Sequence, residues 1–123
     1  MSITYTDGLA LSKGDGPFIT VNVRLQNRSA ETWRQADAFR VGCQTIDAAT
    51  NLFIEDGPRL ALPQDVAPGG TAEVRFEIRL PESDGQYRVF VSPMREDRFW
   101  YYDRGWPIFL VEAAVAGGRA SVI

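Results

Sequence analysis

The chain contains 123 residues, of which 45% are hydrophobic and 24% are charged, and its formal net charge is −3. This length suits one domain with a single core, and the composition argues against a disordered chain. The acidic balance argues against nucleic-acid binding, which usually needs a basic surface, and no stretch is long and apolar enough to predict membrane insertion. The N-terminus lacks the pattern of a secretion signal, which favours a cytoplasmic location for this protein or for a larger one that contains it.

Alternation of apolar and polar residues predicts β-strands along most of the chain. In chain order the pattern covers 18–25, 38–46, 51–55, 59–62, 73–80, 86–94 and 107–113, and the one weak helical candidate is 30–38. The alternation is closest to ideal at 73–80, where Glu73, Arg75, Glu77 and Arg79 share one face. Turn sequences rich in Gly, Pro, Asn and Asp separate the strands.

These strands predict an all-β fold, an immunoglobulin-like antiparallel β-sandwich of seven to eight strands. We expect one domain over residues 1–113 and a flexible C-terminal tail over 114–123, where the alternation stops. Tyr87 follows the turn Asp84-Gly85, a position typical of the corner in which a tyrosine hydroxyl bonds upstream backbone. One phase of each alternating run should point inward, namely Ile19, Val21, Val23, Val41, Leu60, Val74, Phe76, Ile78, Tyr87, Val89 and Val91.

The residue types exclude most catalytic and metal chemistry. The chain has no histidine and a single cysteine, Cys43, so it lacks a histidine-dependent nucleophile, a thiolate or histidine zinc site and an internal disulfide. Glu96 could pair with Asp97 or Asp103 as the acid and base of a glycan hydrolase, but neighbouring arginines explain these carboxylates as surface ion pairs. We therefore expect no enzymatic activity, no metal and no cofactor.

The segment 94–107, here called the aromatic loop, is the candidate functional site. Its position between two predicted strands is typical of a hairpin loop, yet it holds five aromatic residues: Phe99, Trp100, Tyr101, Tyr102 and Trp106. Because loops are normally polar, these rings either fold back onto the protein or present flat faces to a partner. Period-2 alternation can bury only every second ring of residues 99–102, which leaves two rings outward. Trp33, by contrast, is expected in the core.

The order of several motifs resembles that of bacterial immunoglobulin-like accessory modules. The motifs are Val21 to Ser29, Trp33, Arg59 to Pro63, Val66 to Gly70, Leu80-Pro81, Gly85 to Tyr87, and Met94-x-Glu96 followed by Phe99-Trp100. Such modules are appended to glycan-active enzymes, glycosyltransferases and polysaccharide-export proteins. The chain is more distantly similar to the C-terminal glycan-binding domain on the ATPase subunit of O-antigen ABC exporters. The resemblance covers roughly residues 17 to 111 and implies the sandwich fold and an association with glycans.

The resemblance and the aromatic loop together predict a non-catalytic accessory domain that binds a bacterial polysaccharide or docks a neighbouring polysaccharide-biosynthesis or export domain. The expected ligand-binding residues, whose rings would stack on sugars and whose charges would bond hydroxyls, are Glu96, Arg98, Trp100, Tyr101, Tyr102, Arg104 and Trp106. The alternative is a purely structural or protein-interaction sandwich, self-association into a homodimer included. A concave site with convergent polar groups favours the first interpretation, and a flat apolar patch favours the second.

Overall fold

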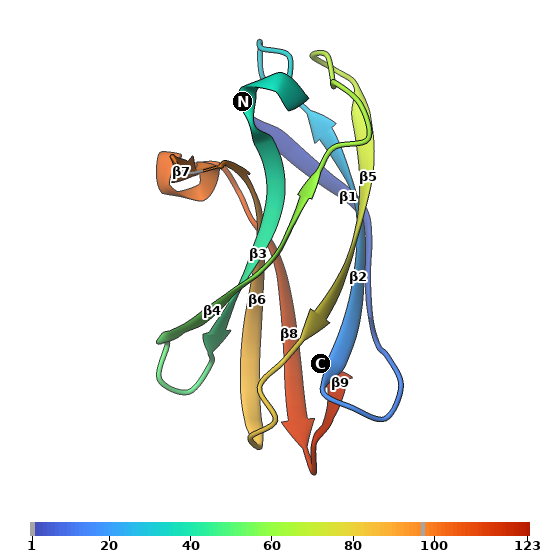
Figure 1. Cartoon of the computed structure of the whole chain (residues 1–123), viewed down its shortest axis with the longest axis vertical. Coiled ribbons are helices and arrows are strands. Elements are labelled where there is room, and N and C mark those ends of the chain that lie inside the picture. The colour runs from blue at the N-terminus through green and yellow to red at the C-terminus, as the bar shows by residue number, and fades with distance from the viewer. Residues whose placement is uncertain (1, 97) are drawn as a thin grey trace.

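The computed structural model describes residues 2–96 and 98–123 and shows two antiparallel sheets packed face to face (Figure 1). The smaller sheet has the strand order β1-β2-β5, in which β1 is Ile3–Ser12, β2 is Phe18–Asn27 and β5 is Thr71–Arg79. The larger sheet has the order β4-β3-β6-β8-β9, in which β3 is Phe39–Asp47, β4 is Phe53–Ala61, β6 is Gly85–Arg95, β8 is Phe109–Ala116 and β9 is Arg119–Val122. A short strand, β7 (Phe99–Trp100), also pairs with β6. The predicted all-β, immunoglobulin-like sandwich is confirmed.

Strand β5 illustrates how the alternating pattern builds the core. Ala72, Val74, Phe76 and Ile78 are at most 7% exposed, whereas the charged residues between them face solvent. Each large apolar side chain that is fully buried contributes about 1.5–3 kcal/mol relative to an exposed one. The residues expected to point inward are all buried except Leu60, which is partly buried against the same core.

The predicted tyrosine corner is present at the start of β6. The hydroxyl of Tyr87 donates a hydrogen bond to the backbone oxygen of Ser83 at 2.7 Å, and the residue is 3% exposed. Because Ser83 belongs to the turn that follows β5, this bond fastens the turn to the next strand.

The predicted flexible tail over 114–123 is wrong, because these residues complete the larger sheet. Strand β8 continues to Ala116, and β9 returns antiparallel along it. Gly117 and Gly118 have φ values of 60° and 76°, a left-handed conformation that glycine adopts easily in a two-residue hairpin turn. Alanines on both faces of β8 conceal the alternation that marks the other strands.

Two further segments differ from the sequence prediction. Alternation does not reveal β1, because a register shift between Thr6 and Leu9 interrupts it, with Asp7 at a φ of 52°. The helical candidate 30–38 contains only a short 3₁₀ helix, η1 (Gln35–Asp37).

The segment between β2 and β3 lies at one end of the molecule, and the aromatic loop projects from the side of the larger sheet near that end (Figure 1). The β1–β2 and β3–β4 hairpins lie at the other end. Such clustering of loops at two ends is a general property of immunoglobulin-like sandwiches. Among residues 2–96 and 98–123, no helix has the length and hydropathy needed to cross a membrane.

Candidate functional site

The aromatic loop folds back on β6 and has a regular backbone. Strand β7 pairs with the end of β6, and the 3₁₀ helix η2 (Tyr101–Arg104) follows. Gly105 ends this helix with a φ of 85°, and its N–H donates to the backbone oxygen of Tyr102 at 3.1 Å. The hydroxyl of Tyr5 fastens the end of the loop by donating to the backbone oxygen of Pro107 at 2.9 Å. These bonds give the rings of the loop defined directions.

The predicted aromatic binding residues lie on two sides of the loop. Tyr101 and Trp106 pack against the core at the end of the sandwich, with ring centroids 4.2 Å apart. Trp100 and Tyr102 lie over the outer face of the larger sheet, with ring centroids 5.9 Å apart. All four are half-buried, so no ring of the loop points fully outward in the way that the period-2 pattern predicted. The strand ends at Trp100, and Tyr101 and Tyr102 reach opposite sides from η2.

A cavity of about 310 Å³, here called the end cavity, lies beside Tyr101 and Trp106. Trp33 also lines it, with a ring centroid 6.2 Å from that of Trp106. Trp33 is 3% exposed and stacks on Phe39 at 5.0 Å, so its expected core position is confirmed. The other lining residues come from the β2–β3 segment and from β6: Ser29, Ala30, Glu31, Thr32 and Arg95.

Polar groups of both signs converge on the end cavity. Arg95 donates from Nε to the Tyr101 hydroxyl at 3.0 Å and from Nη1 to the backbone oxygen of Asp37 at 3.4 Å. The hydrogen bond with Tyr101 raises the pKa of Arg95, which stays charged. Glu31 is exposed and adds a carboxylate to the lining. The end cavity therefore offers a donor fork, an anionic acceptor and three aromatic rings.

The indole N–H of Trp33 is buried and has no hydrogen-bond acceptor among the residues that the structure describes. A buried donor without a partner costs about 1–3 kcal/mol. Because this N–H is closed to solvent, a ligand in the end cavity reaches it only if the surrounding side chains shift.

On the other side of the loop, a chain of polar contacts crosses the outer face of the larger sheet. Tyr102 donates from its hydroxyl to Gln44 Oε1 at 2.7 Å, and Gln44 Nε2 donates to Asp56 Oδ1 at 3.0 Å. Arg59 forms ion pairs with Asp56 at 3.3 Å and with Glu96 at 2.6 Å. Desolvation, followed by nearby carboxylates, raises the pKa of Tyr102, so its hydroxyl keeps the proton that it donates.

The ring of Trp100 occupies the space that a side chain on Gly42 would need. A Cβ atom on Gly42 would lie 2.8 Å from Trp100 Cη2 and 3.2 Å from Met94 Sδ. Gly42 and Gln44 are outer-face positions of β3, yet both are buried. The aromatic loop accounts for this burial, because Trp100 lies over the first and Tyr102 is bonded to the second.

The three predicted charged residues do not line the end cavity. Glu96 belongs to the polar chain of the outer face, and Arg104 lies over the ring of Phe99, with its Cζ 3.8 Å from the ring centroid. Arg98 is exposed. Asp97, the other member of the carboxylate pair considered for hydrolysis, lies outside the described residues.

Sequence reasoning missed Glu31 and Arg95, and it assigned Trp33 to the core alone. The signal that could have found them is topological, because immunoglobulin-like sandwiches place the loop between their second and third strands beside the loop that holds the aromatic residues here. Polar residues just before Trp33 thus become candidates for the same site.

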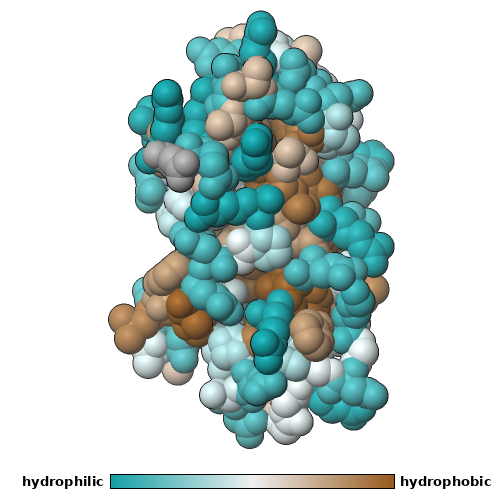
Figure 2. Space-filling model, in the orientation of Figure 1, coloured by the Kyte–Doolittle hydropathy of each residue, from teal (hydrophilic) through white to brown (hydrophobic). Residues whose placement is uncertain are grey.

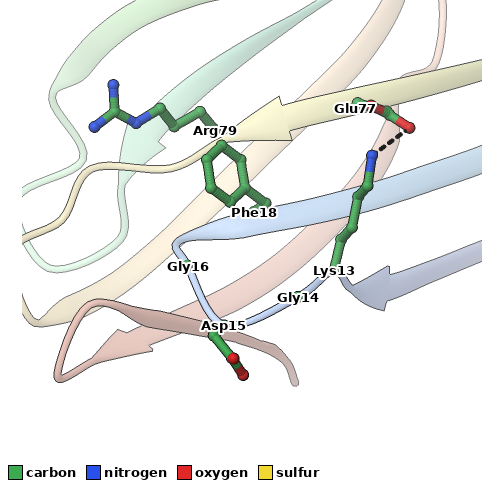
Figure 3. A pocket seen from close by; sticks show the side chains of 7 residues that line it. All are labelled: Lys13, Gly14, Asp15, Gly16, Phe18, Glu77 and Arg79. Carbon is green, nitrogen blue, oxygen red and sulfur yellow. Dashed lines mark ion pairs between the residues drawn. The ribbon is translucent and has the colours of Figure 1, made fainter.

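A second cavity, of about 510 Å³, lies at the opposite end of the molecule beside the β1–β2 hairpin (Figure 3). Phe18 forms its one aromatic wall. Its charged residues Lys13, Asp15 and Arg79 all have ion-pair partners, as in the contact of Lys13 with Glu77 at 2.6 Å. With fewer rings and these charges already paired, this cavity is a weaker candidate than the smaller end cavity.

No protein-family model matches the chain, and no curated protein matches it significantly. The resemblance to glycan-associated accessory modules therefore stays a prediction from sequence motifs.

Proposed function

We propose that the protein is a non-catalytic domain that binds a sugar residue of a bacterial polysaccharide in the end cavity. One observation carries this proposal: the rings of Trp33, Tyr101 and Trp106 and the charges of Glu31 and Arg95 meet in a single concavity of about 310 Å³. A concave site with convergent polar groups is typical of small-ligand binding, and this volume is at the small end of the usual range.

The lining suits the two kinds of surface that a sugar ring presents. Its C–H face packs on flat aromatic rings such as Tyr101 and Trp106, which bury apolar area with little loss of side-chain freedom. Its hydroxyls both donate and accept hydrogen bonds, so they match a guanidinium donor and a carboxylate acceptor at once. The opposite charges of Glu31 and Arg95 also give no preference for a strongly charged ligand.

The carboxylates support a binding role rather than hydrolysis. Glycoside hydrolysis normally uses two carboxyl groups that flank the scissile bond. Among the described residues, the end cavity is lined by one carboxylate, Glu31. Glu96 is held in an ion pair with Arg59 on the outer face of the sheet.

As a biological context we propose an accessory role in polysaccharide assembly or export, in which this domain holds the glycan for a neighbouring protein or domain. The motif order described above supports this context, and the fold is compatible with it but serves many other functions.

Titration of the folded protein with a panel of purified bacterial polysaccharides and their oligosaccharides tests the proposal. We expect at least one glycan to bind, and we expect Glu31→Gln to weaken that binding roughly tenfold to hundredfold, because a charge-assisted hydrogen bond is lost. Glu31 is exposed, so its thermal melt should match the wild type.

Glu55→Gln is the matched control, since Glu55 is an exposed carboxylate on β4, far from the lining of the end cavity. In dilute, monomeric protein Trp100→Ala should also leave glycan affinity unchanged, because this ring lies on the outer face. The proposal fails if no glycan of the panel binds, or if Glu31→Gln and Glu55→Gln weaken binding equally.

A further inference from the structure

The outer face of the larger sheet carries an apolar patch that stays partly exposed in the monomer. We call it the outer-face patch, and it consists of Ile46, Phe53, Phe90, Trp100, Tyr102 and Leu110. Phe53 is 56% exposed and Leu110 is 45% exposed. Large apolar side chains exposed as a group, unlike single ones, mark interaction surfaces.

Strand register places the patch on β4, β3, β6 and β8 as two apolar pairs that are diagonal neighbours, because Ile46 is opposite Arg88 and Phe90 is opposite Gln44. Phe53 is the cross-strand partner of Ile46, and Phe90 is the partner of Leu110. The ring of Tyr102 meets that of Phe90 edge-on, with centroids 6.4 Å apart. Beyond Phe53 the apolar surface extends to the exposed residues Leu52 and Ile54, and Figure 2 shows hydrophobic residues gathered at this hairpin, at the lower left.

The smaller sheet provides an internal comparison. An antiparallel sheet with one face on the core normally has polar residues on its other face. Strand β5 follows this rule, since its outer positions are the charged residues Glu73, Arg75, Glu77 and Arg79. Strand β1 places Leu9 and Leu11 on the same outer face, but each is opposite a polar partner, Asn22 or Thr20. Strands β6 and β8 depart from it with Phe90 and Leu110 at outer positions. Solvent contact alone therefore does not explain the outer-face patch.

We propose that the outer-face patch is the interface between two copies of this chain, related by a two-fold axis and packed sheet on sheet. Charge is the reason for choosing a second copy as the partner. The charged groups bordering the patch are Arg88 with Glu112 at 3.7 Å, Arg59 with Asp56 and Glu96, and Arg40, which is opposite Met94 on β6, so three arginines balance three carboxylates. A patch in a two-fold contact meets itself, so it must not carry net charge. A strongly charged partner would find no complementary net charge on this face.

The size of the patch sets the strength of this contact. Four strands at a spacing of ~4.8 Å give a width of about 19 Å, and the stretch of β3 from residue 40 to residue 46 gives a length of about 23 Å. The whole face, its charged residues included, is then about 440 Å² per copy, or about 900 Å² for the pair, and even this upper limit is below the ~1,200 Å² of a stable standard interface. The dimer is therefore weak and forms with rising concentration. The overall charge of −3 opposes it little at physiological salt, where the screening length is about 8 Å.

Sedimentation velocity of the full chain between about 10 μM and 1 mM tests this proposal, since weak interfaces dissociate within such a range. We expect the wild type to shift from monomer to dimer, and Leu110→Glu to remain monomeric with an unchanged melting temperature. Leu110→Thr should weaken the dimer at least severalfold, and it introduces a β-branched residue, which strands favour, if the glutamate variant folds poorly. Raising the salt concentration should not weaken the wild-type dimer, because the contact is apolar.

Leu11→Glu is the matched control. Leu11 is 56% exposed on the outer face of the smaller sheet, but its cross-strand partner is Thr20 rather than an aromatic residue. This variant should dimerise like the wild type. A wild type that stays monomeric to 1 mM overturns the proposal, as does a dimer that Leu11→Glu disrupts as strongly as Leu110→Glu. Binding of glycan is measured separately, so neither result depends on the end cavity.

Discussion

Replacing Gly42 by alanine should destabilise the protein through Trp100 and not through the backbone. The φ angle of Gly42 is not positive, so the strand itself accepts an alanine. Its new methyl carbon would lie 2.8 Å from Trp100 Cη2 and 3.2 Å from Met94 Sδ. Carbon atoms in ordinary contact are ~3.5–4.0 Å apart, so the Trp100 ring has to move outward by roughly 0.7–1.2 Å.

Two opposing terms set the size of the effect. Overpacking of this kind costs about 1–3 kcal/mol. Alanine in place of glycine inside a strand recovers roughly 0.5–1 kcal/mol of backbone entropy. We therefore expect Gly42→Ala to lower the free energy of unfolding by about 0.5–2 kcal/mol. In a Trp100→Ala background the clash with the ring is gone and only the 3.2 Å approach to the flexible Met94 side chain remains, so the same change should be neutral or stabilising by up to about 1 kcal/mol.

Urea denaturation of the wild type, the two single variants and the double variant measures this coupling as a double-mutant cycle. The expected interaction free energy is about 1–3 kcal/mol, with the double variant more stable than the sum of the single effects predicts. Effects that add within about 0.5 kcal/mol would show that Trp100 does not cover Gly42 in solution.

Two further predictions concern Tyr87 and Cys43. Tyr87→Phe removes the hydrogen bond to Ser83 and should lower the free energy of unfolding by about 1 kcal/mol, which lowers the melting temperature by roughly 3–6 °C. An unchanged melting temperature would show that this hydrogen bond does not stabilise the tyrosine corner. Burial raises the pKa of the Cys43 thiol from an ordinary 9.0 to about 12, so the native state holds this proton more tightly than the unfolded state does. The contribution of this protonated thiol to the free energy of unfolding is complete below pH 9. It is lost as the pH rises from 9 to 12, with a slope of up to about 1.4 kcal/mol per pH unit. In urea titrations at pH 8 to 11, Cys43→Ala should show a shallower decline in stability than the wild type, and parallel declines would refute the assignment.

The core was predictable from the sequence because buried and exposed positions alternate along each strand, and the residue types of most strands alternate with them. Strand β5 shows this alternation clearly, since most of its charged side chains are separated by single apolar ones. Strand β8 does not, because Ala113 and Ala114 lie on opposite faces and look alike in the sequence. The hairpin to β9 was nevertheless marked by Gly117-Gly118, a pair that suits a two-residue turn.

The candidate site was predictable only in part, because its residues come from distant segments. The aromatic loop stands out by composition, and alternation correctly separates Trp100 from Tyr101. Local patterns cannot show that Glu31 lies beside Trp106, because that neighbourhood depends on how strands β2, β3, β6 and β8 are ordered in the two sheets. Once the fold is known, the shared end of the sandwich supplies this information.

Tyr101 and Tyr102 are neighbours in one 3₁₀ turn, yet one ring lines the end cavity and the other lies on the outer-face patch. The two proposed contacts therefore depend on the same short backbone, and a shift of this turn by either contact changes the geometry that the other contact meets. Thermodynamic linkage makes the effect reciprocal, so the factor by which glycan tightens the dimer equals the factor by which dimerisation tightens glycan binding. Two copies held close together would also bind one polysaccharide at two points, which raises the overall affinity without any new contact.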